Sequence, residues 1–370
     1  MSTGHLILFA IQWAAGAWLM ARIPGPQGSR IGRAAGEREP TVSVIVPARN
    51  EEASLPLLLD SLATQTSPAA EVIVVDDHSE DATASLAASS GARVLAAPPL
   101  REGWRGKPAA CAAGSEVATG DLLVFLDADV TLAPGALAAL VDEHRHRGGL
   151  VSVQPYHVTV RAYERLSAVC NVVSMMGTLA FTGPPRSQVT MAFGPCLITS
   201  RSDYDAVGGH TSPTVRSQVI EDIALARCFR AAGRPVSVLG GRTMVRFRMY
   251  PGGLRQLIDG WNRSLGVGAR GTSPVAIVAP FLWVWGALIA AWDGLGAVAG
   301  GPHRVVDAVV YAVWAVQIGW MLRRIGRFGV LTAAVFPVPL IAFVALFLRS
   351  VVHLVARRQI RWRGRLVKGR

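Results

Sequence analysis

Two apolar runs of this chain stop abruptly at pairs of aspartates. The run at residues 71–75 (EVIVV) ends in Asp76-Asp77, and the run at 122–126 (LLVFL) ends in Asp127-Ala128-Asp129. Short, uninterrupted apolar runs are typical of strands buried on both faces of a parallel sheet. Ligands of such sheets bind just beyond the carboxyl ends of the strands. The pattern therefore predicts an α/β fold with an acidic ligand site along one edge of its sheet.

The segments around these runs continue the alternation of strand and helix. Strand patterns at 41–47, 71–75, 93–95 and 122–126 alternate with helical patterns at 51–63, 81–89 and 107–118. This βαβα series predicts a mostly parallel sheet wrapped by helices.

The first strand pattern runs directly into Pro47-Ala48-Arg49-Asn50-Glu51. At the carboxyl edge of the sheet these residues would contact a nucleotide. The alternative is an ordinary strand-to-helix turn, in which an acidic residue favours the helix N-terminus. In the neighbouring cluster, Asp76 or Asp77 could accept a hydrogen bond from the base or ribose of that nucleotide.

Asp127 and Asp129 are separated by one residue at a strand end. Two carboxylates so placed suit a hard divalent ion such as Mg²⁺ or Mn²⁺, which prefers oxygen ligands, including phosphate oxygens. The segment Gly103–Lys107 (GWRGK) lies between the acidic clusters. Its glycines let the backbone approach a phosphate and Lys107 adds positive charge; the alternative is a flexible basic loop.

A third acidic cluster, Glu221-Asp222, opens a helix-like stretch. Either carboxylate could act as a general base that takes a proton from an attacking hydroxyl. The alternative is charge complementarity with the helix N-terminus.

Apolar segments at both ends of the chain predict membrane attachment. Of the 370 residues 51% are hydrophobic, and the net charge is +12. Many basic residues flank the apolar segments 6–21, 274–292, 305–322 and 329–355. Basic flanks orient membrane segments, whereas a nucleic-acid-binding domain would interleave basic and aromatic residues. We therefore expect a multi-pass protein of the cell (inner) membrane that binds no nucleic acid and has a cytoplasmic catalytic domain.

The expected domains are a membrane anchor at 1–22, a linker at 23–40, the α/β domain at 41–272, membrane helices at 273–355 and a basic tail at 356–370. About three helices are expected in the fourth region. Pro337 and Pro339 interrupt the last of them, and one of the three is expected to be re-entrant or interfacial.

Together these residues resemble glycosyltransferase family 2, whose members have the GT-A fold, over about residues 41–265. Within the family the chain is most similar to the membrane-bound 4,4′-diaponeurosporenoate (carotenoid) glycosyltransferase-like branch. The segments that carry this closer resemblance are Gly103–Pro108, Ser152–His157, Phe193–Cys196, Gly208–His210, Arg248–Pro251, Gly260-Trp261 and Trp362–Arg365.

The resemblance implies an inverting, single-step transfer of a sugar from a UDP-sugar, with UDP-glucose expected, to a membrane lipid. Asp129, with Asp127, would bind Mg²⁺ or Mn²⁺, and Asp222, beside Glu221, would be the base. The residues implied to hold the nucleotide-sugar are Pro47, Ala48, Arg49, Glu51, Asp76, Asp77, Lys107, Asp127, Arg255 and Trp261.

The acceptor implied by the resemblance is a carotenoid-type carboxylate or hydroxyl, with a hopanoid as an alternative. A second hypothesis is a processive polysaccharide synthase. Its Q-x-x-R-W element is not matched, since Gln256 and Trp261 are five residues apart and no arginine precedes Trp261. A third hypothesis is a non-catalytic membrane scaffold, which loss of Asp129 or Asp222 would have favoured; both are present.

Overall fold

A computed structural model describes residues 3–26, 38–183, 189, 191–268, 273–355, 360–362 and 365–367. The chain forms two compact units. The sheet unit comprises Pro24–Tyr156 and Ser187–Arg248; the helical unit comprises Met1–Ile23, His157–Arg186 and Met249–Arg370. The segment His157–Arg186 therefore groups with the terminal helices, although it lies in the middle of the sequence.

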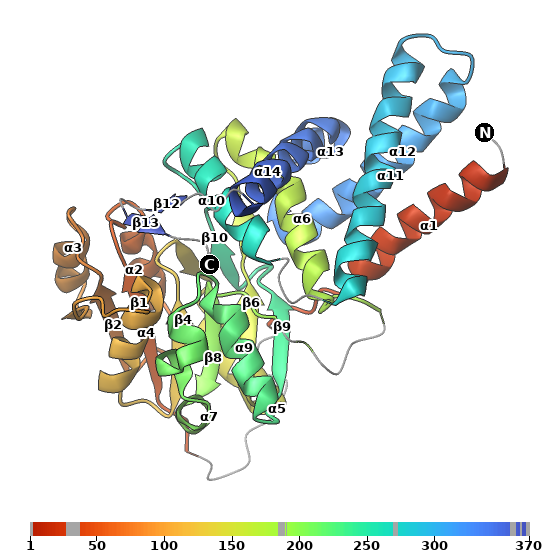
Figure 1. The fold of residues 1–370 in the computed structure, drawn as a ribbon. Helices are drawn as coiled ribbons and strands as arrows, with labels where there is room; N and C mark the ends of the chain where they lie inside the picture. The colour runs from red at the N-terminus through yellow and green to blue at the C-terminus, as the bar shows by residue number, and fades with distance from the viewer. Residues whose placement is uncertain are drawn as a thin grey trace. The chain divides into compact units, whose positions relative to one another are not determined.

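The sheet unit is built on a seven-stranded sheet with the order β3-β2-β1-β4-β8-β6-β9 (Figure 1). All neighbouring strands are parallel except β8, which is antiparallel to both β4 and β6. The predicted mostly parallel α/β fold is confirmed. The strands are β1 (Val42–Ala48), β2 (Glu71–Asp76), β3 (Arg93–Ala96), β4 (Leu122–Leu126), β6 (Leu150–Gln154), β8 (Cys196–Ser200) and β9 (Val236–Gly240). A smaller antiparallel pair joins β5 (Val130–Leu132) to β10 (Val245–Phe247).

Helices follow the strands as the apolar spacing predicts. The first of them, α2, buries leucines at positions 55, 58, 59 and 62, the i, i+3, i+4, i+7 stripe of an amphipathic helix. The helices of this unit are α2 (Leu55–Ala63), α3 (Thr83–Ser89), α4 (Gly106–Val117), α5 (Ala136–Arg147), α7 (Arg201–Ala206), α8 (Pro213–Arg216) and α9 (Glu221–Ala231).

The register of the central strands brings their carboxyl ends to one edge. Ala48 of β1 pairs with Asp76 of β2, and β1 is also parallel to β4. The residues that follow these strands, among them Arg49, Asp77 and Asp127, therefore leave the sheet at the same edge.

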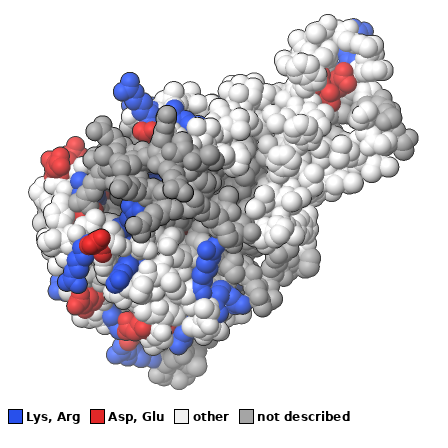
Figure 2. Space-filling model, in the orientation of Figure 1, with Lys and Arg blue, Asp and Glu red and all other residues white. Residues whose placement is uncertain are grey.

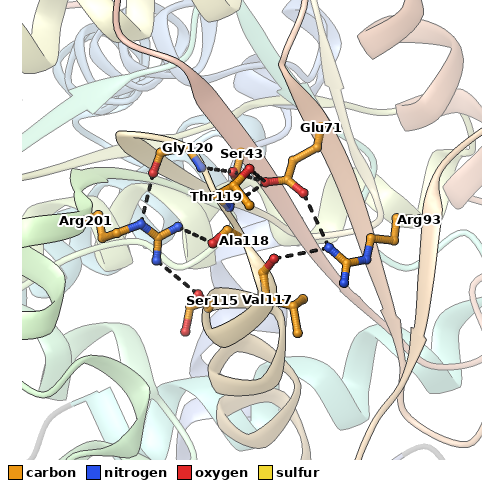
Figure 3. Close-up of polar contacts among 9 residues, drawn as sticks. All are labelled: Ser43, Glu71, Arg93, Ser115, Val117, Ala118, Thr119, Gly120 and Arg201. Carbon is orange, nitrogen blue, oxygen red and sulfur yellow. Dashed lines mark hydrogen bonds and ion pairs between the residues drawn. The ribbon is translucent and has the colours of Figure 1, made fainter.

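A polar cluster closes the opposite edge, where β2 and β4 begin (Figure 3). The Glu71 carboxylate accepts hydrogen bonds from the Ser43 hydroxyl at 2.7 Å and from the Thr119 amide and hydroxyl at 2.6 and 2.7 Å. Burial raises the pKa of Glu71, but these hydrogen bonds and Arg93 outweigh burial and lower it from its usual value. Glu71 therefore stays ionised and holds the turn between α4 and β4.

Arg201 binds the same turn from the other side. Its guanidinium donates to the carbonyl oxygens of Ala118 (2.7 Å), Gly120 (3.1 Å) and Ser115 (3.2 Å). The carboxyl end of α4 is thus fixed to the sheet, while its N-terminus lies at the ligand edge.

The helical unit contains two helices that are long and apolar enough to cross a membrane, α11 (Pro274–Val298) and α12 (Arg304–Ile325). Only 33% of the apolar window of each is buried, which is low for core helices. On the face shown in Figure 2, their surface is almost free of charged side chains except near the end where they are joined. Two shorter apolar helices are also described, Ile7–Leu19 within α1 (Thr3–Leu19) and Pro337–His353 within α14 (Pro337–Val355).

The last apolar segment is interrupted at Pro337, as predicted, but not at Pro339, which lies in the first turn of the next helix. A short helix, α13 (Val330–Ala334), ends before Pro337, and α14 begins at Pro337. The unit also contains η1 (Ala162–Leu166), α6 (Ser167–Thr178) and α10 (Leu254–Gly268). Most of the expected linker, at 27–37, and much of the basic tail lie outside the described residues.

Small and polar residues join the apolar helices. Gly16 of α1 lets the Trp283 ring of α11 approach, since a Cβ there would come within 2.2 Å of the ring. The Trp283 indole donates to the Gln317 side chain at 2.8 Å, and the Gln317 amide donates to the Trp13 carbonyl at 2.7 Å. Close approach at glycine and interhelical hydrogen bonds therefore hold these helices together.

Candidate active site

Arg49 leaves β1 and lies against the end of β2. Its guanidinium donates to the Asp77 carbonyl at 2.9 Å and lies 3.9 Å from the Asp77 carboxylate, and both side chains are about nine-tenths buried. The Asp77 amide donates in turn to the Ala48 carbonyl at 2.8 Å. The structure therefore brings together the residues predicted from the ends of the first two strands.

Both strand ends carry backbone strain. Asn50 has a φ of 52° and His78 a φ of 57°, a left-handed conformation that non-glycine residues seldom adopt. Reciprocal contacts hold these turns: the Asn50 amide donates to Ser79 Oγ at 3.0 Å, and Asn50 Oδ1 accepts from the Glu80 amide at 2.8 Å. Strained turns of this kind concentrate at functional sites.

Asp76 and Glu51 flank this pair of turns. Asp76 Oδ2 accepts from the Ser79 amide at 3.3 Å, while Oδ1 is buried and has no hydrogen-bond partner within the described part of the chain. The Glu51 amide donates to the Thr83 hydroxyl at 2.8 Å. A buried acceptor without a partner is costly unless a ligand supplies the donor, which a nucleobase N–H or ribose hydroxyl can do.

Lys107 joins the other two acidic clusters. Its Nζ lies 2.7 Å from Asp127 Oδ1 and 2.9 Å from Glu221 Oε1. Burial alone would lower the pKa of Lys107, but these two carboxylates outweigh it and raise the pKa well above its usual value. The ammonium is therefore charged, and it links the end of β4 to the first residue of α9.

Asp222 follows Glu221 and is 8% exposed. Burial, and next the charge of Glu221, raise the pKa of Asp222 to about 7, while Lys107 acts in the opposite direction. A carboxylate with such a pKa can accept a proton near neutral pH.

Gly194 lies directly against Lys107 and Asp222. A Cβ at this position would come within 3.1 Å of Lys107 Nζ and 3.2 Å of Asp222 Oδ2. The next residue, Pro195, accepts a hydrogen bond from the Asp127 amide at 3.0 Å. The sequence analysis assigned Gly194 no role. The feature that could have identified it is its place in the Phe193–Cys196 segment, which carries part of the family resemblance and leads into β8.

Asp129 is half-buried beside the end of β4, and its carbonyl accepts from the Arg248 amide at 3.4 Å. Among the described residues there is no cluster of three or more His, Cys, Asp or Glu suited to a metal. A divalent ion at the aspartate pair would therefore take its remaining oxygen ligands from elsewhere, as Mg²⁺ does from phosphate and water.

Arg255 and Trp261 belong to α10 of the helical unit. Trp261 is 3% exposed, its indole donates to the Ser167 hydroxyl at 2.9 Å, and its ring lies edge-on to Tyr250. Arg255 is exposed. Trp261 thus has a packing role within its own unit, and donor or acceptor contacts of either residue stay a prediction.

The apolar segment 172–181 lies in the helical unit. Val172, Met175, Met176 and Phe181 are all nearly or completely buried, so these side chains pack in the core of the helical unit.

Comparison with known proteins agrees with the fold. Residues 43–208 match the family model "Glycosyl transferase family 2". The chain also resembles a mannosyltransferase from Pyrobaculum calidifontis, solved with GDP-Man and Mn²⁺, with a TM-score of 0.53 at 19% identity over 95% of each chain. At that identity the likeness shows the fold alone.

The relatives are closer in sequence. The chain is 36% identical over 338 residues, 89% of each protein, to 4,4′-diaponeurosporenoate glycosyltransferase from Staphylococcus haemolyticus. It is 35% identical to the Staphylococcus aureus protein of the same name, over 88% of this chain and 87% of the relative.

Fold and comparisons together define a GT-A-type glycosyltransferase. The chain belongs to glycosyltransferase family 2, and relatives that it matches over most of its length include 4,4′-diaponeurosporenoate glycosyltransferases.

Proposed function

We propose that this enzyme transfers a sugar from a UDP-sugar, with UDP-glucose the first candidate, to a carboxylate of a carotenoid-type membrane lipid. The observation that carries this proposal is the convergence of Arg49, Asp77, Asp127 and Lys107 at one sheet edge, with Asp222 beside them. The acceptor class rests on the relatives, which are glycosyltransferases named for 4,4′-diaponeurosporenoate, a carotenoid carboxylate.

In this account the nucleoside lies over the ends of β1 and β2. The unpartnered Asp76 oxygen accepts from the base or ribose, and Arg49 and Asp77 hold the turn in place. Pro47, Ala48 and Glu51 form the wall of this pocket, as parallel-sheet ligand sites use the residues just beyond their strands.

The donor set of Asp127 and Asp129 fits Mg²⁺ or Mn²⁺, because both residues offer carboxylate oxygens and a nucleoside diphosphate offers more. These side chains would hold the ion, which when bound neutralises charge on the leaving diphosphate. Lys107 adds a fixed positive charge at the same place.

The reaction is a single displacement with inversion. An acceptor oxygen attacks the anomeric carbon as the bond from that carbon to the UDP oxygen breaks, and UDP leaves with the electron pair. A carboxylate acceptor is already deprotonated, so Asp222 then serves to position it. A hydroxyl acceptor would have to give up its proton, and Asp222 would take it.

We further propose that α11 and α12 cross the cell membrane and that the sheet unit lies in the cytoplasm. The apolar surface of these helices supports this arrangement, and a lipid acceptor would then be met at the membrane interface. Arginines near the predicted cytoplasmic ends, such as Arg323 and Arg324 in the last turn of α12, agree with that orientation.

A hydroxylated carotenoid or a hopanoid would be the alternative acceptor, and a processive synthase or a non-catalytic scaffold the alternative function. The test uses membranes that contain either the wild type or Asp129→Ala, supplied with several UDP-sugars, Mg²⁺ or Mn²⁺, and extracted lipids. We expect a metal-dependent glycolipid from the wild type that the variant does not form. A polymer as product would favour the synthase, and neither product nor UDP release would favour the scaffold.

A further inference from the structure

The Gly103–Lys107 segment makes contacts that donor binding by Lys107 does not require. The guanidinium of Arg216 lies over the Trp104 ring, 5.5 Å from its centroid. The Arg105 amide donates to the Arg216 carbonyl at 2.8 Å, and Arg105 Nε donates to the Ser217 carbonyl at 3.3 Å. We call these contacts the clasp.

Both sides of the clasp are themselves held. On one side, Gly103 has a φ of +77°, a turn that favours glycine, and the Trp104 amide donates to the Arg101 carbonyl at 3.1 Å. On the other side, Val215 of α8 is completely buried in the core of the sheet unit.

Each of the two segments joined by the clasp leads directly into a helix that begins with residues of the candidate active site. Arg105 immediately precedes α4, which carries Lys107 on its second residue. Ser217 is followed by the irregular residues 218–220 and then by Glu221 and Asp222, the first residues of α9. The Lys107–Glu221 ion pair, at 2.9 Å, is a second contact between the same two segments, at the candidate active site.

We propose that the clasp is a positioning device, in which Trp104 and Arg216 fix the start of α4 against the segment before α9 and thereby align Asp222 with the donor held at Lys107 and Asp127. Trp104 and Arg216 are positioning residues in this account and need not touch substrate. The inference rests on the proposed function and extends it to a pair of residues outside the donor site.

The nucleotide pocket at β1 and β2 contains no residue of the clasp. Loosening the clasp should therefore reduce the rate of transfer more than donor binding, because small misplacements of reacting groups lower the rate steeply. We expect Trp104→Ala and Arg216→Ala each to lower kcat about tenfold while the KM for the donor changes less than about twofold.

The two side chains make one contact, so the double variant should be no slower than either single variant. Trp104→Phe keeps an aromatic face for the guanidinium and should recover most of the rate. Arg101→Ala, which removes an exposed arginine of the same loop, is the matched control and should keep the kcat of the wild type.

A second measurement is independent of turnover. Hydrogen–deuterium exchange of the full-length protein in detergent should show faster exchange of the Arg105 amide and of residues 218–222 in Arg216→Ala than in Arg101→Ala. The exchange rates of these amides are compared with those of the other amides of the same variant. Unfolding would raise the exchange rates throughout the sheet unit, whereas loss of the clasp would raise them only at these residues.

Additive losses in the double variant, an unchanged kcat, or a rise in KM alone would overturn the positioning role. Unchanged exchange would overturn the clasp itself. If the wild type formed no glycoside from any donor, the proposed function would fail and the catalytic role of the clasp with it, while the exchange result would still decide whether the contact holds the two segments together.

Discussion

Lys107 Nζ lies 2.7 Å from Asp127 Oδ1, so a lysine from the start of a helix is paired with the first carboxylate after β4. The same ammonium lies 2.9 Å from Glu221 at the start of α9. One side chain therefore links the predicted metal and diphosphate position to the predicted base position, and the segments on which the proposed chemistry depends are held as a unit.

Replacement of Asp222 should lower the rate of sugar transfer more for a hydroxyl acceptor than for a carboxylate acceptor. With a hydroxylated carotenoid, Asp222→Asn should lower the rate by about 10²-fold or more, because the general base is lost. With a carotenoid carboxylate, which needs no proton removed, we expect a loss of about tenfold or less. Product formation by the two enzymes with both acceptors measures this. Equal losses with both acceptors would contradict the base role, and Asp60→Asn, at an exposed position on α2, is the control.

The raised pKa of Asp222 also predicts a pH-dependent cost in stability. The folded protein keeps this proton up to a pH of about 7, whereas the unfolded chain releases it near the usual pKa of an aspartate, 3.8. The stabilising contribution of protonated Asp222 is therefore full below the unfolded pKa and is lost as the pH rises through the folded pKa.

Asp222→Asn cannot lose a proton, so its free energy of unfolding relative to the wild type should increase between about pH 5 and about pH 8. Urea unfolding at both pH values measures the difference. A difference that stays constant with pH, or one that Asp60→Asn shows equally, would mean that the pKa of Asp222 is not raised in the folded protein.

Much of the fold could be predicted from the sequence, because strands β1 to β4 and helices α2 to α4 are encoded by local apolar patterns. Their carboxylate ends identified one edge of the sheet as the candidate site before any tertiary contact was known. The insertion of β8 antiparallel between β4 and β6 could not be predicted in that way, since pairing partners depend on long-range packing.

The site was only partly accessible for the same reason. Lys107 was identified from charge and from its glycine neighbours, but its pairing with Glu221 joins residues that no local pattern connects. Gly194 was missed because its role depends on its closeness to Lys107 and Asp222, which are distant from it in the sequence. The grouping of His157–Arg186 with the terminal helices was missed because an apolar helix has the same sequence pattern whether it packs in the sheet unit or in the helical unit.

Gly194→Ala should impair catalysis without unfolding the protein. The added methyl group would come within 3.1 Å of Lys107 Nζ and 3.2 Å of Asp222 Oδ2, and these side-chain ends can shift to make room. We expect kcat to fall about tenfold, since a displaced catalytic group is poorly aligned. Gly135→Ala, where a Cβ meets nothing within 4 Å, is the matched control. Wild-type activity in Gly194→Ala would show that the contact is unimportant.

Arg201→Ala should instead destabilise the sheet unit. Its guanidinium satisfies the carbonyl oxygens of Ser115, Ala118 and Gly120, and losing such a donor should cost about 2–4 kcal/mol. Arg145→Ala removes an i,i+3 pair with Asp142 and should cost less than about 0.5 kcal/mol. Thermal unfolding of the purified proteins compares them. Equal losses in the two variants would contradict the role of Arg201.

The most direct test of the central claim uses purified enzyme in lipid nanodiscs with a carotenoid carboxylate, isotope-labelled UDP-glucose and Mg²⁺ or Mn²⁺. Mass spectrometry would follow the lipid before and after mild alkali, which cleaves a glycosyl ester but leaves the acetal linkage of an O-glycoside intact. The account predicts a labelled, alkali-labile glycosyl ester of inverted anomeric configuration, formed by the wild type and not by Asp129→Ala. An alkali-stable product, or labelled sugar found only in polymer or in free glucose, would contradict it.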